Sequence, residues 1–267
     1  MTSLKERLHG KEVTFGSWIT LGHPAIGEIL AGCGFDWLTI DMEHSAITLA
    51  GCQGLVQVIE LAGCSPLVRV GENAPNLIKR VMDAGAHGVI VPQVNSREDA
   101  LRAVASVKYP PEGARGVGLG RAQGYGVGFD AYRKWNDEES IVIVQVEHIE
   151  AVRHLGEILK VPGVDGFIVG PYDLSASLGH PGEFTRPEFL EAMNQIHLLM
   201  KQVPGVAPGF HVVQPDPGDV AKKIREGYRF IGYSLDSLLL ADTCRRDLAT
   251  VSGGRIRPRR FIKETGG

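Results

Sequence analysis

The sequence predicts a (β/α)8 barrel, formed by a single domain over residues 1–250. Eight short apolar runs, rich in Val and Ile and bounded by Gly, Pro or Asp, recur along its 267 residues. Most runs are continuous rather than alternating, which is typical of parallel strands buried on both faces. Helical patterns separate the runs, and about 250 residues is the usual size of such a barrel. The competing architecture, an open doubly wound sheet, usually has fewer strands and a phosphate-binding loop after the first one.

The first strand is followed by LGHPAIGE, which contains no GxGxxG pattern and so favours the barrel. The predicted strands lie within residues 13–21, 35–41, 65–70, 87–93, 141–147, 165–170, 208–213 and 228–234. The clearest helical patterns cover residues 50–62, 75–84, 96–107, 187–203 and 217–227. Proline near the start of several of these segments and glycine just after the end of others are ordinary helix boundaries.

Two segments interrupt this alternation. Residues 108–130 form a long Gly-rich stretch between the fourth and fifth strands, and loops of this length are usually functional or act as lids. Residues 251–267 carry four Arg and one Lys against one Glu. We expect this basic C-terminal tail to be flexible and solvated, with contact to a partner subunit as the alternative.

Composition limits the classes of function. The formal net charge is −3, which argues against binding to nucleic acid. No apolar run approaches the roughly 18 residues that a membrane span needs, and the N-terminus lacks the apolar stretch of a signal peptide. The four cysteines form no CxxC pair. These features predict a reduced, cytoplasmic, enzyme-sized protein.

Two carboxylates predict a site for a hard cation. Catalytic groups of barrel enzymes gather at the carboxyl ends of the strands. Glu147 ends the fifth apolar run, and Asp173 follows the sixth in the sequence GPYDLS. Each has a simpler interpretation, as a charged strand end and as a helix N-cap. On neighbouring strands, however, two carboxylates with water suit Mg²⁺ or Mn²⁺.

Further polar residues occupy the same ends of the first three strands. Asp41 and His44 follow the second strand, at a spacing that lets a carboxylate orient an imidazole. Arg69 ends the third strand, where a buried guanidinium needs either a protein carboxylate or a substrate oxyanion. Trp18, on the first strand, is either a core residue or a substrate contact.

The sequence disfavours catalysis by a Schiff-base lysine and by a serine or cysteine nucleophile. None of the ten lysines lies inside an apolar strand run, so a Schiff-base mechanism is not expected. The sequence also contains no GxSxG elbow, and no cysteine at a strand end near a base.

These residues lie in motifs that resemble the HpcH/HpaI family of class II, metal-dependent pyruvate aldolases, which includes 4-hydroxy-2-oxoheptanedioate and 2-dehydro-3-deoxyglucarate aldolases. The motifs are IDMEHSAI at 40–47, LVRV at 67–70, VQVE at 144–147 and VGPYDLSASLG at 169–179. The resemblance extends from about residue 4 to 250. It implies a barrel whose last helix is exchanged between subunits, in a hexamer built as a trimer of dimers.

The resemblance also implies roles for the catalytic residues. Glu147 and Asp173 match the metal ligands, for Mg²⁺, Mn²⁺ or Co²⁺. His44 and Asp41 match the base and the carboxylate that orients it. Arg69 matches the arginine that stabilises the developing oxyanion.

The remaining matches concern substrate binding. Gln145 and Trp18 match residues near the bound 2-oxo acid, and the backbone around Tyr172 and Asp173 matches the site for its carboxylate. His211, on the seventh strand, stands where relatives present an apolar side chain toward the aldehyde. We therefore expect His211 to shift preference toward a polar or acidic aldehyde.

The implied reaction is the reversible cleavage of 4-hydroxy-2-oxo acids to pyruvate and an aldehyde, with a divalent cation stabilising the pyruvate enolate. One alternative is a lyase of the same superfamily acting on a CoA ester of the malyl-CoA or citramalyl-CoA type. A second is a metal-independent glycoside hydrolase with Glu147 and Asp173 as its acid and base. A third is a barrel retained for binding or assembly without catalysis. No nucleic-acid or membrane partner is expected.

Overall fold

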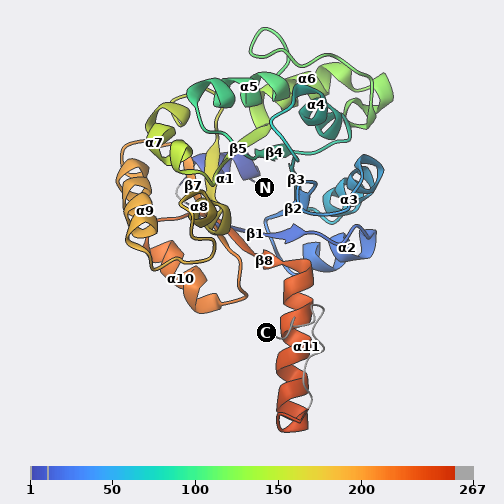
Figure 1. Ribbon diagram of the computed structural model, residues 1–267. Helices are drawn as coiled ribbons and strands as arrows, with labels where there is room; N and C mark the ends of the chain where they lie inside the picture. The colour runs from blue at the N-terminus through green and yellow to red at the C-terminus, as the bar shows by residue number, and fades with distance from the viewer. Residues whose placement is uncertain (1, 11, 256–267) are drawn as a thin grey trace.

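The computed structural model describes residues 2–10 and 12–255. It is a closed barrel of eight parallel strands in which each strand pairs with the next in sequence and β8 pairs with β1, which confirms the predicted fold (Figure 1). Six strands lie within the predicted apolar runs, whereas β7 begins one residue before its run and β8 ends one residue after its run. The strands are β1 Thr14–Ile19, β2 Trp37–Asp41, β3 Ser65–Arg69, β4 Gly88–Val91, β5 Ile141–Val146, β6 Gly166–Val169, β7 Ala207–Val212 and β8 Phe230–Leu235.

Helices surround the barrel in the order that the alternating pattern predicts (Figure 1). They are α1 Leu4–His9, α2 Pro24–Ala31, α3 Leu49–Leu61, α4 Pro75–Asp83, α5 Arg97–Val107, α6 Phe129–Glu139, α7 Ile149–Ile158, α8 Pro171–Ser177, α9 Pro187–Met200, α10 Pro217–Arg225 and α11 Asp236–Ser252. Side-chain or proline caps fix most of their starts, as in α5, where Ser96 accepts a hydrogen bond from the backbone of Asp99.

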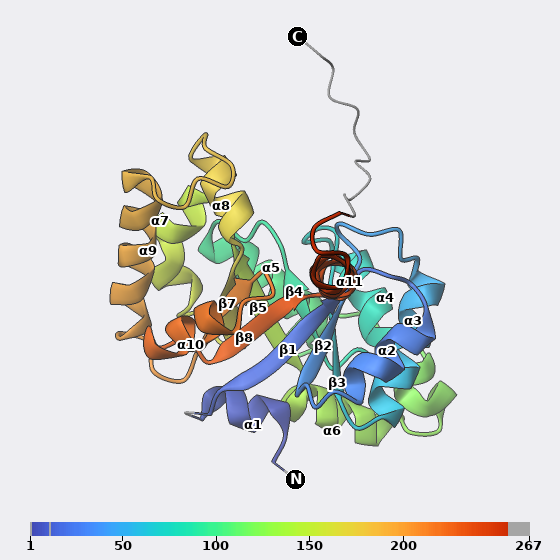
Figure 2. The ribbon, with the colours of Figure 1, turned by 90° about the horizontal axis from the view of Figure 1, so that it is seen from below.

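The short helix α1 closes the N-terminal end of the barrel, beside the start of β1 in Figure 2. Its Leu4 and Leu8 join the apolar cluster inside the strands. Trp37 and Phe230 belong to the same cluster and stack with their ring centroids 4.0 Å apart. Gly16 makes room for them, because a Cβ there would lie 2.0 Å from the Trp37 ring. The N-terminal end is therefore filled with apolar side chains.

The Gly-rich stretch after α5 is more ordered than a simple loop. It contains a 3-10 helix, η1 Arg121–Gly126, and leads into α6. Buried Arg115 donates to Asp83 Oδ1 over 2.5 Å and to the Tyr132 hydroxyl over 2.9 Å. Gln123 donates to the Tyr109 hydroxyl over 2.8 Å. These buried polar contacts tie the segment to α4 and α6.

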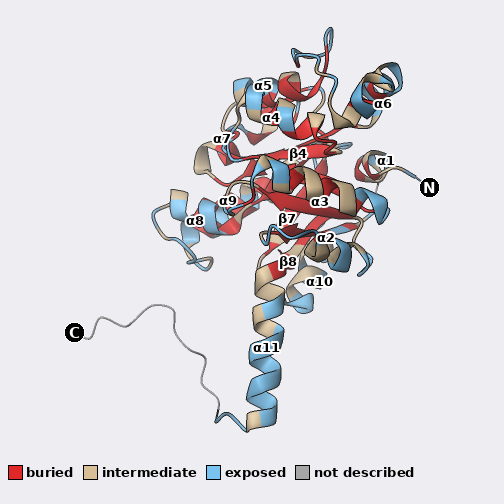
Figure 3. Cartoon of the chain, turned by 90° about the vertical axis from the view of Figure 1, so that its right-hand side faces the viewer, coloured by how far each residue is buried: buried red, intermediate tan, exposed pale blue. Residues whose placement is uncertain are grey.

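The last helix, α11, extends away from the barrel and is exposed along most of its length (Figure 3). Asp236 is its one buried residue, and it accepts hydrogen bonds from the backbone N–H groups of Thr20 and Leu21. Leu240 and Val251 are 60% and 79% exposed. Exchange of this helix between subunits stays a prediction. Of the predicted basic tail, residues 256–267 lie outside the described residues.

No helix within the described ranges is both long enough and apolar enough to cross a membrane.

Replacing Leu8 tests the role of α1 as the closure of the barrel. Leu8 is 2% exposed, so Leu8→Ala should leave a cavity and lower the free energy of unfolding by about 2–5 kcal/mol. Leu61→Ala is the matched control, because Leu61 is 86% exposed and its truncation should change stability by no more than about 0.5 kcal/mol. Denaturant unfolding of both variants measures the difference. Equal effects would show that α1 does not contribute to the core.

Candidate active site

Polar side chains converge at the carboxyl ends of the strands, opposite α1. A cavity of about 150 Å³ opens there, which we call the mouth. Its lining brings together residues from six strands or the turns that follow them. They are Trp18, His44, Arg69, Gln145, Ile168, Val169, Gly170, Pro171, Tyr172, Asp173, His211 and Val213. Seven of the nine predicted site residues are in this lining, and the other two, Asp41 and Glu147, lie next to it.

Asp41 and Arg69 form a bidentate ion pair. They stand opposite each other in the register of β2 and β3. Arg69 donates from Nε to Asp41 Oδ1 over 3.0 Å and from Nη2 to Oδ2 over 2.7 Å. Burial of Asp41 opposes its ionisation, but the hydrogen bonds and the charge of Arg69 outweigh this and lower the pKa of the carboxyl. Asp41 is therefore ionised at neutral pH.

A stack of side chains forms the floor of the mouth. The guanidinium carbon of Arg69 lies 4.5 Å from the centroid of the Trp18 ring, a cation–π contact. The ring of His211 lies 5.0 Å from Trp18 on centroids, tilted by 36°. Trp18 thus belongs to the inner core and also contacts two polar side chains of the mouth.

Glu147 is a buried carboxylate held by three donors. Its Oε1 accepts from the backbone N–H of Gln93 over 2.7 Å and from Gln93 Nε2 over 3.0 Å. Its Oε2 accepts from Gln145 Nε2. Burial raises the pKa of Glu147 despite these hydrogen bonds, and the negative charge of Asp173 adds to the effect. A nearby cation would stabilise the ionised form of Glu147.

The donor set around Glu147 fits a divalent cation by its charge. Asp173 follows Gly170 and Pro171 in the first turn of α8. Glu43 is subject to the same charges. Burial and the negative charges of three carboxylates, Glu147, Asp41 and Asp173, raise its pKa to about 7, although the positive charge of Arg69 opposes this. Glu43 thus interacts electrostatically with three other carboxylates and with Arg69. No cluster of three or more His, Cys, Asp or Glu side chains suited to a metal ion occurs in residues 2–10 and 12–255, so the fit rests on two carboxylates with water.

His44 lies at the open side of the mouth, with its side chain 61% exposed. Asp41 accepts a hydrogen bond from the backbone N–H of His44 over 3.2 Å, and the rest of its carboxylate is engaged by Arg69 and the N–H of Glu43. The carboxylate oxygen nearest the His44 ring is Glu43 Oε2, 3.8 Å from Nε2. The Asp41 carboxylate thus contacts the backbone of the turn that carries His44. Orientation of the imidazole by Asp41 stays a prediction.

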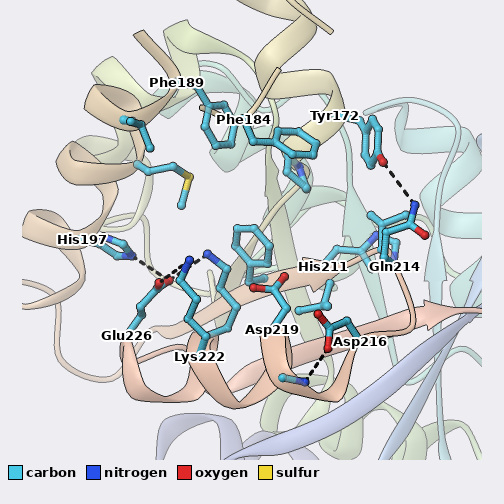
Figure 4. A pocket seen from close by; sticks show the side chains of 18 of the residues that line it. Tyr172, Phe184, Phe189, His197, His211, Gln214, Asp216, Asp219, Lys222 and Glu226 are labelled. Atoms are coloured by element: carbon cyan, nitrogen blue, oxygen red, sulfur yellow. Dashed lines mark hydrogen bonds and ion pairs between the residues drawn. The ribbon is translucent and has the colours of Figure 1, made fainter. Parts of the chain in front are cut away.

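A second, larger cavity adjoins the mouth. It has a volume of about 820 Å³ and lies between α9 and α10, bordered by the end of β7 (Figure 4). Pro171, Tyr172, His211 and Val213 line both spaces. Figure 4 shows Tyr172 and Gln214 at one edge of this side cavity, where Gln214 Nε2 lies 3.5 Å from the Tyr172 hydroxyl. Its far end carries paired charges, with Lys223 Nζ 2.9 Å from Glu226 Oε2.

Two residues of the site were not among the predicted ones. Gln93 follows β4 and adopts a φ of +53°, a left-handed conformation that lets its backbone and side chain both reach Glu147. Glu43 lies between Asp41 and His44. The rule that located the other residues, a polar group after an apolar run, also applies to Gln93 in VIVPQ.

Comparison with known proteins identifies the family of the chain. Residues 14–243 match the family model described as HpcH/HpaI aldolase/citrate lyase. The chain belongs to this family.

Aldolases and an aldolase/citrate lyase family protein are among the relatives of the chain. A 2-keto-3-deoxy-L-rhamnonate aldolase from Escherichia coli O9:H4 (strain HS) is 35% identical over 257 residues, which cover 96% of this chain and 95% of the relative. An HpcH/HpaI aldolase/citrate lyase family protein from Burkholderia cenocepacia J2315 superposes with a TM-score of 0.88 at 37% identity, covering 93% and 98% of the two chains. An HpcH/HpaI aldolase from Desulfitobacterium hafniense DCB-2 gives 0.85 at 29% identity, covering 97% and 100%. These similarities support the prediction of a lyase.

Acid titration of stability tests the state of His211. Burial lowers the pKa of His211 to about 4, below the ordinary value of 6.5. Between these values the unfolded chain binds a proton that the folded protein does not. Stability of the wild type relative to His211→Gln should therefore fall as the pH drops from about 6.5 to 4, by roughly 3 kcal/mol at most. Unfolding free energies of both proteins at several pH values check this. A difference that does not change with pH would mean that the pKa of His211 is not lowered.

Proposed function

We propose that this protein is a divalent-metal-dependent aldolase that reversibly cleaves 4-hydroxy-2-oxo acids to pyruvate and an aldehyde. The observation that carries the proposal is the buried carboxylate of Glu147, whose pKa is raised by the negative charge of Asp173 and lowered by the positive charge of Arg69. This arrangement suits a reaction in which negative charge develops on a small 2-oxo acid. The name of the Escherichia coli relative, an aldolase for a 2-keto-3-deoxy acid, supports the same class of substrate.

Glu147 and Asp173 would hold the cation, with Mg²⁺, Mn²⁺ or Co²⁺ as candidates. When bound, the cation supplies positive charge to the 2-oxo oxygen and the carboxylate of the substrate. Gln93 and Gln145 hold both oxygens of Glu147 in place by hydrogen bonds. A Cβ at position 170 would be in ordinary contact with this carboxylate, 3.7 Å from Glu147 Oε2, so Gly170 leaves space there that a larger side chain would occupy.

The remaining residues bind the substrate and move its proton. The backbone N–H groups of Tyr172 and Asp173 are proposed to bind the substrate carboxylate, while Trp18 and Gln145 flank the 2-oxo group. Gln145 has an unused acceptor, since its Oε1 is buried and has no hydrogen-bond partner in the part of the chain that the structure describes.

In the cleavage direction, His44 takes the proton of the 4-hydroxyl as the bond between C3 and C4 breaks. The electron pair of that bond moves toward the 2-oxo oxygen and forms the enolate of pyruvate. Arg69 stabilises the charge that develops there, and its orientation is fixed by the two hydrogen bonds to Asp41. Protonation of the enolate at C3 gives pyruvate, and aldol addition follows the reverse path.

We also propose that the protein is a cytoplasmic hexamer, a trimer of dimers in which α11 is exchanged between subunits. The exposure of Leu240, Leu248 and Val251 on this helix supports packing against another chain.

Removal of the metal tests the proposed function directly. Pyruvate release from racemic 4-hydroxy-2-oxo acids should be lost after EDTA treatment and should return with Mg²⁺, Mn²⁺ or Co²⁺. Glu147→Gln should not recover activity with any of the three ions, because the amide is a poorer ligand than the carboxylate. Activity that persists in EDTA would reject the Glu147–Asp173 metal site. Absence of pyruvate with every ion would favour the CoA-ester lyase.

Replacing Arg69 tests its role in the transition state. Arg69→Met should lower kcat for pyruvate release by about 10²–10³-fold, the usual effect of losing a fixed charge at a developing oxyanion. Arg69→Lys should recover little of it, since an ammonium cannot form the bidentate pair with Asp41. Arg153→Met is the control, because Arg153 lies on the outer surface of α7 and its side chain is 61% exposed. A kcat within a few-fold of wild type in both Arg69 variants would contradict this role.

A further inference from the structure

We infer that His211 selects the aldehyde partner of the reaction. Its Nδ1 atom accepts a hydrogen bond from a hydroxyl group on the aldehyde, so that a hydroxyaldehyde is preferred over an aldehyde carrying a methyl group or a carboxylate at that position. The inference rests on the proposed aldolase activity and specifies its second substrate.

His211 occupies the place in the barrel that suits this role. On β7, Phe210 and Val212 point outward and join the core between strands and helices. His211 points inward, stacks beside Trp18 and lines both the mouth and the side cavity. Figure 4 shows it near Gln214 among the residues that line the side cavity. A substrate that extends from the mouth toward the side cavity therefore passes this ring.

The contact between His211 and β8 fixes which ring nitrogen carries the proton. Nε2 lies 3.1 Å from the backbone carbonyl oxygen of Ser234. A carbonyl oxygen only accepts, so Nε2 is the protonated nitrogen and Nδ1 of the neutral ring is an acceptor. The Cδ2 edge also faces β8, since a Cβ at Gly232 would lie 3.4 Å from it. Nδ1 therefore points away from β8, and it has no hydrogen-bond partner among the described residues.

A β-bulge places the Ser234 carbonyl in position for this contact. Between the pairs Gly16–Gly232 and Trp18–Leu235, β8 has one residue more than β1. Ser234 lies in this bulge with a φ of +53°, a conformation that costs a residue other than glycine on the order of 1 kcal/mol or more. Bulges near active sites commonly re-aim a group of the strand. The orientation of the His211 ring is thus set by the backbone conformation of β8.

The charge of the surroundings separates a hydroxyl from a carboxylate. Burial, with a contribution from the positive charge of Arg69, lowers the pKa of His211 to about 4, so the ring is neutral at pH 7. Among the described residues that line the mouth, Arg69 is the one permanently charged cation, and Asp41 already binds it in bidentate fashion. A carboxylate on the aldehyde would meet a lone pair at Nδ1 and no free cation there, whereas a hydroxyl can donate to Nδ1. Of the two kinds of aldehyde expected from the sequence, polar and acidic, the charges around His211 therefore favour an uncharged polar aldehyde.

The test compares aldehydes of matched size in the addition of pyruvate with Mg²⁺ or Mn²⁺ present. Glycolaldehyde carries a hydroxyl where propanal carries a methyl group, and glyoxylate carries a carboxylate on its aldehyde carbon. The ratio of kcat/KM for glycolaldehyde to that for propanal should fall by about three- to tenfold in His211→Leu, the effect of one neutral hydrogen bond. Comparing ratios between proteins removes the intrinsic reactivity of each aldehyde.

Three further variants make the outcome decisive. His211→Asn, which offers an acceptor near the position of Nδ1, should keep a ratio closer to wild type. His211→Phe keeps a flat ring without an acceptor and gives the same test if the leucine variant does not fold. His154→Leu removes a histidine from the outer helix α7, where His154 contacts the backbone of Asn95, and should leave the ratio unchanged.

An unchanged ratio in His211→Leu and His211→Phe, with pyruvate still consumed, would overturn the inference. A wild type that prefers glyoxylate and loses that preference in these variants would overturn it as well. Failure of the wild type to join pyruvate to any of the three aldehydes would instead count against the proposed aldolase.

Discussion

The ion pair between Arg69 and Asp41 is the interaction on which the arrangement of the mouth depends. A guanidinium and a carboxylate removed from water each need a partner, and the register of β2 and β3 places these two directly opposite each other. The pair holds Arg69 over Trp18. It also leaves Asp41 Oδ1 able to accept from the backbone of Glu43 and His44, so the turn after β2 takes its shape from the same carboxylate.

The carboxylates of the site differ in pKa because their surroundings differ. Arg69 overcomes the burial of Asp41 and lowers its pKa, whereas burial and neighbouring negative charges raise the pKa of Glu43 to about 7. Burial also raises the pKa of Glu147 in spite of its three donors. A site with excess negative charge favours a cation as its ligand. The proposed chemistry needs such a cation and Arg69 together, because the 2-oxo acid adds negative charge of its own.

The sequence predicts the strands and the end of the barrel that carries the chemistry, because both follow from apolar runs and the polar residues after them. It does not predict contacts set by register or by unusual backbone conformation. Spacing along the chain suggests a pair of Asp41 with His44, but the side-chain partner of Asp41 comes from the adjacent strand. Gln93 reaches Glu147 through a positive φ, and His211 reaches β8 through a bulge at Ser234. Neither the positive φ of Gln93 nor the bulge at Ser234 can be recognised from the residue types at these positions.

Trp18 shows that the core and the site are not separate structures in this barrel. Its ring packs in the apolar cluster inside the barrel and also contacts Arg69 and His211 in the mouth. Its Nε1 is buried and has no hydrogen-bond partner within residues 2–10 and 12–255. The glycine at position 232 leaves room for this atom, since a Cβ there would lie 3.1 Å away. A smaller side chain at Trp18 would therefore loosen the apolar packing and also release the two side chains that hold charge and select the substrate. Loss of activity in such a variant would not by itself distinguish binding from stability, whereas substitutions of His211 and Arg69 leave the Trp18 side chain itself unchanged.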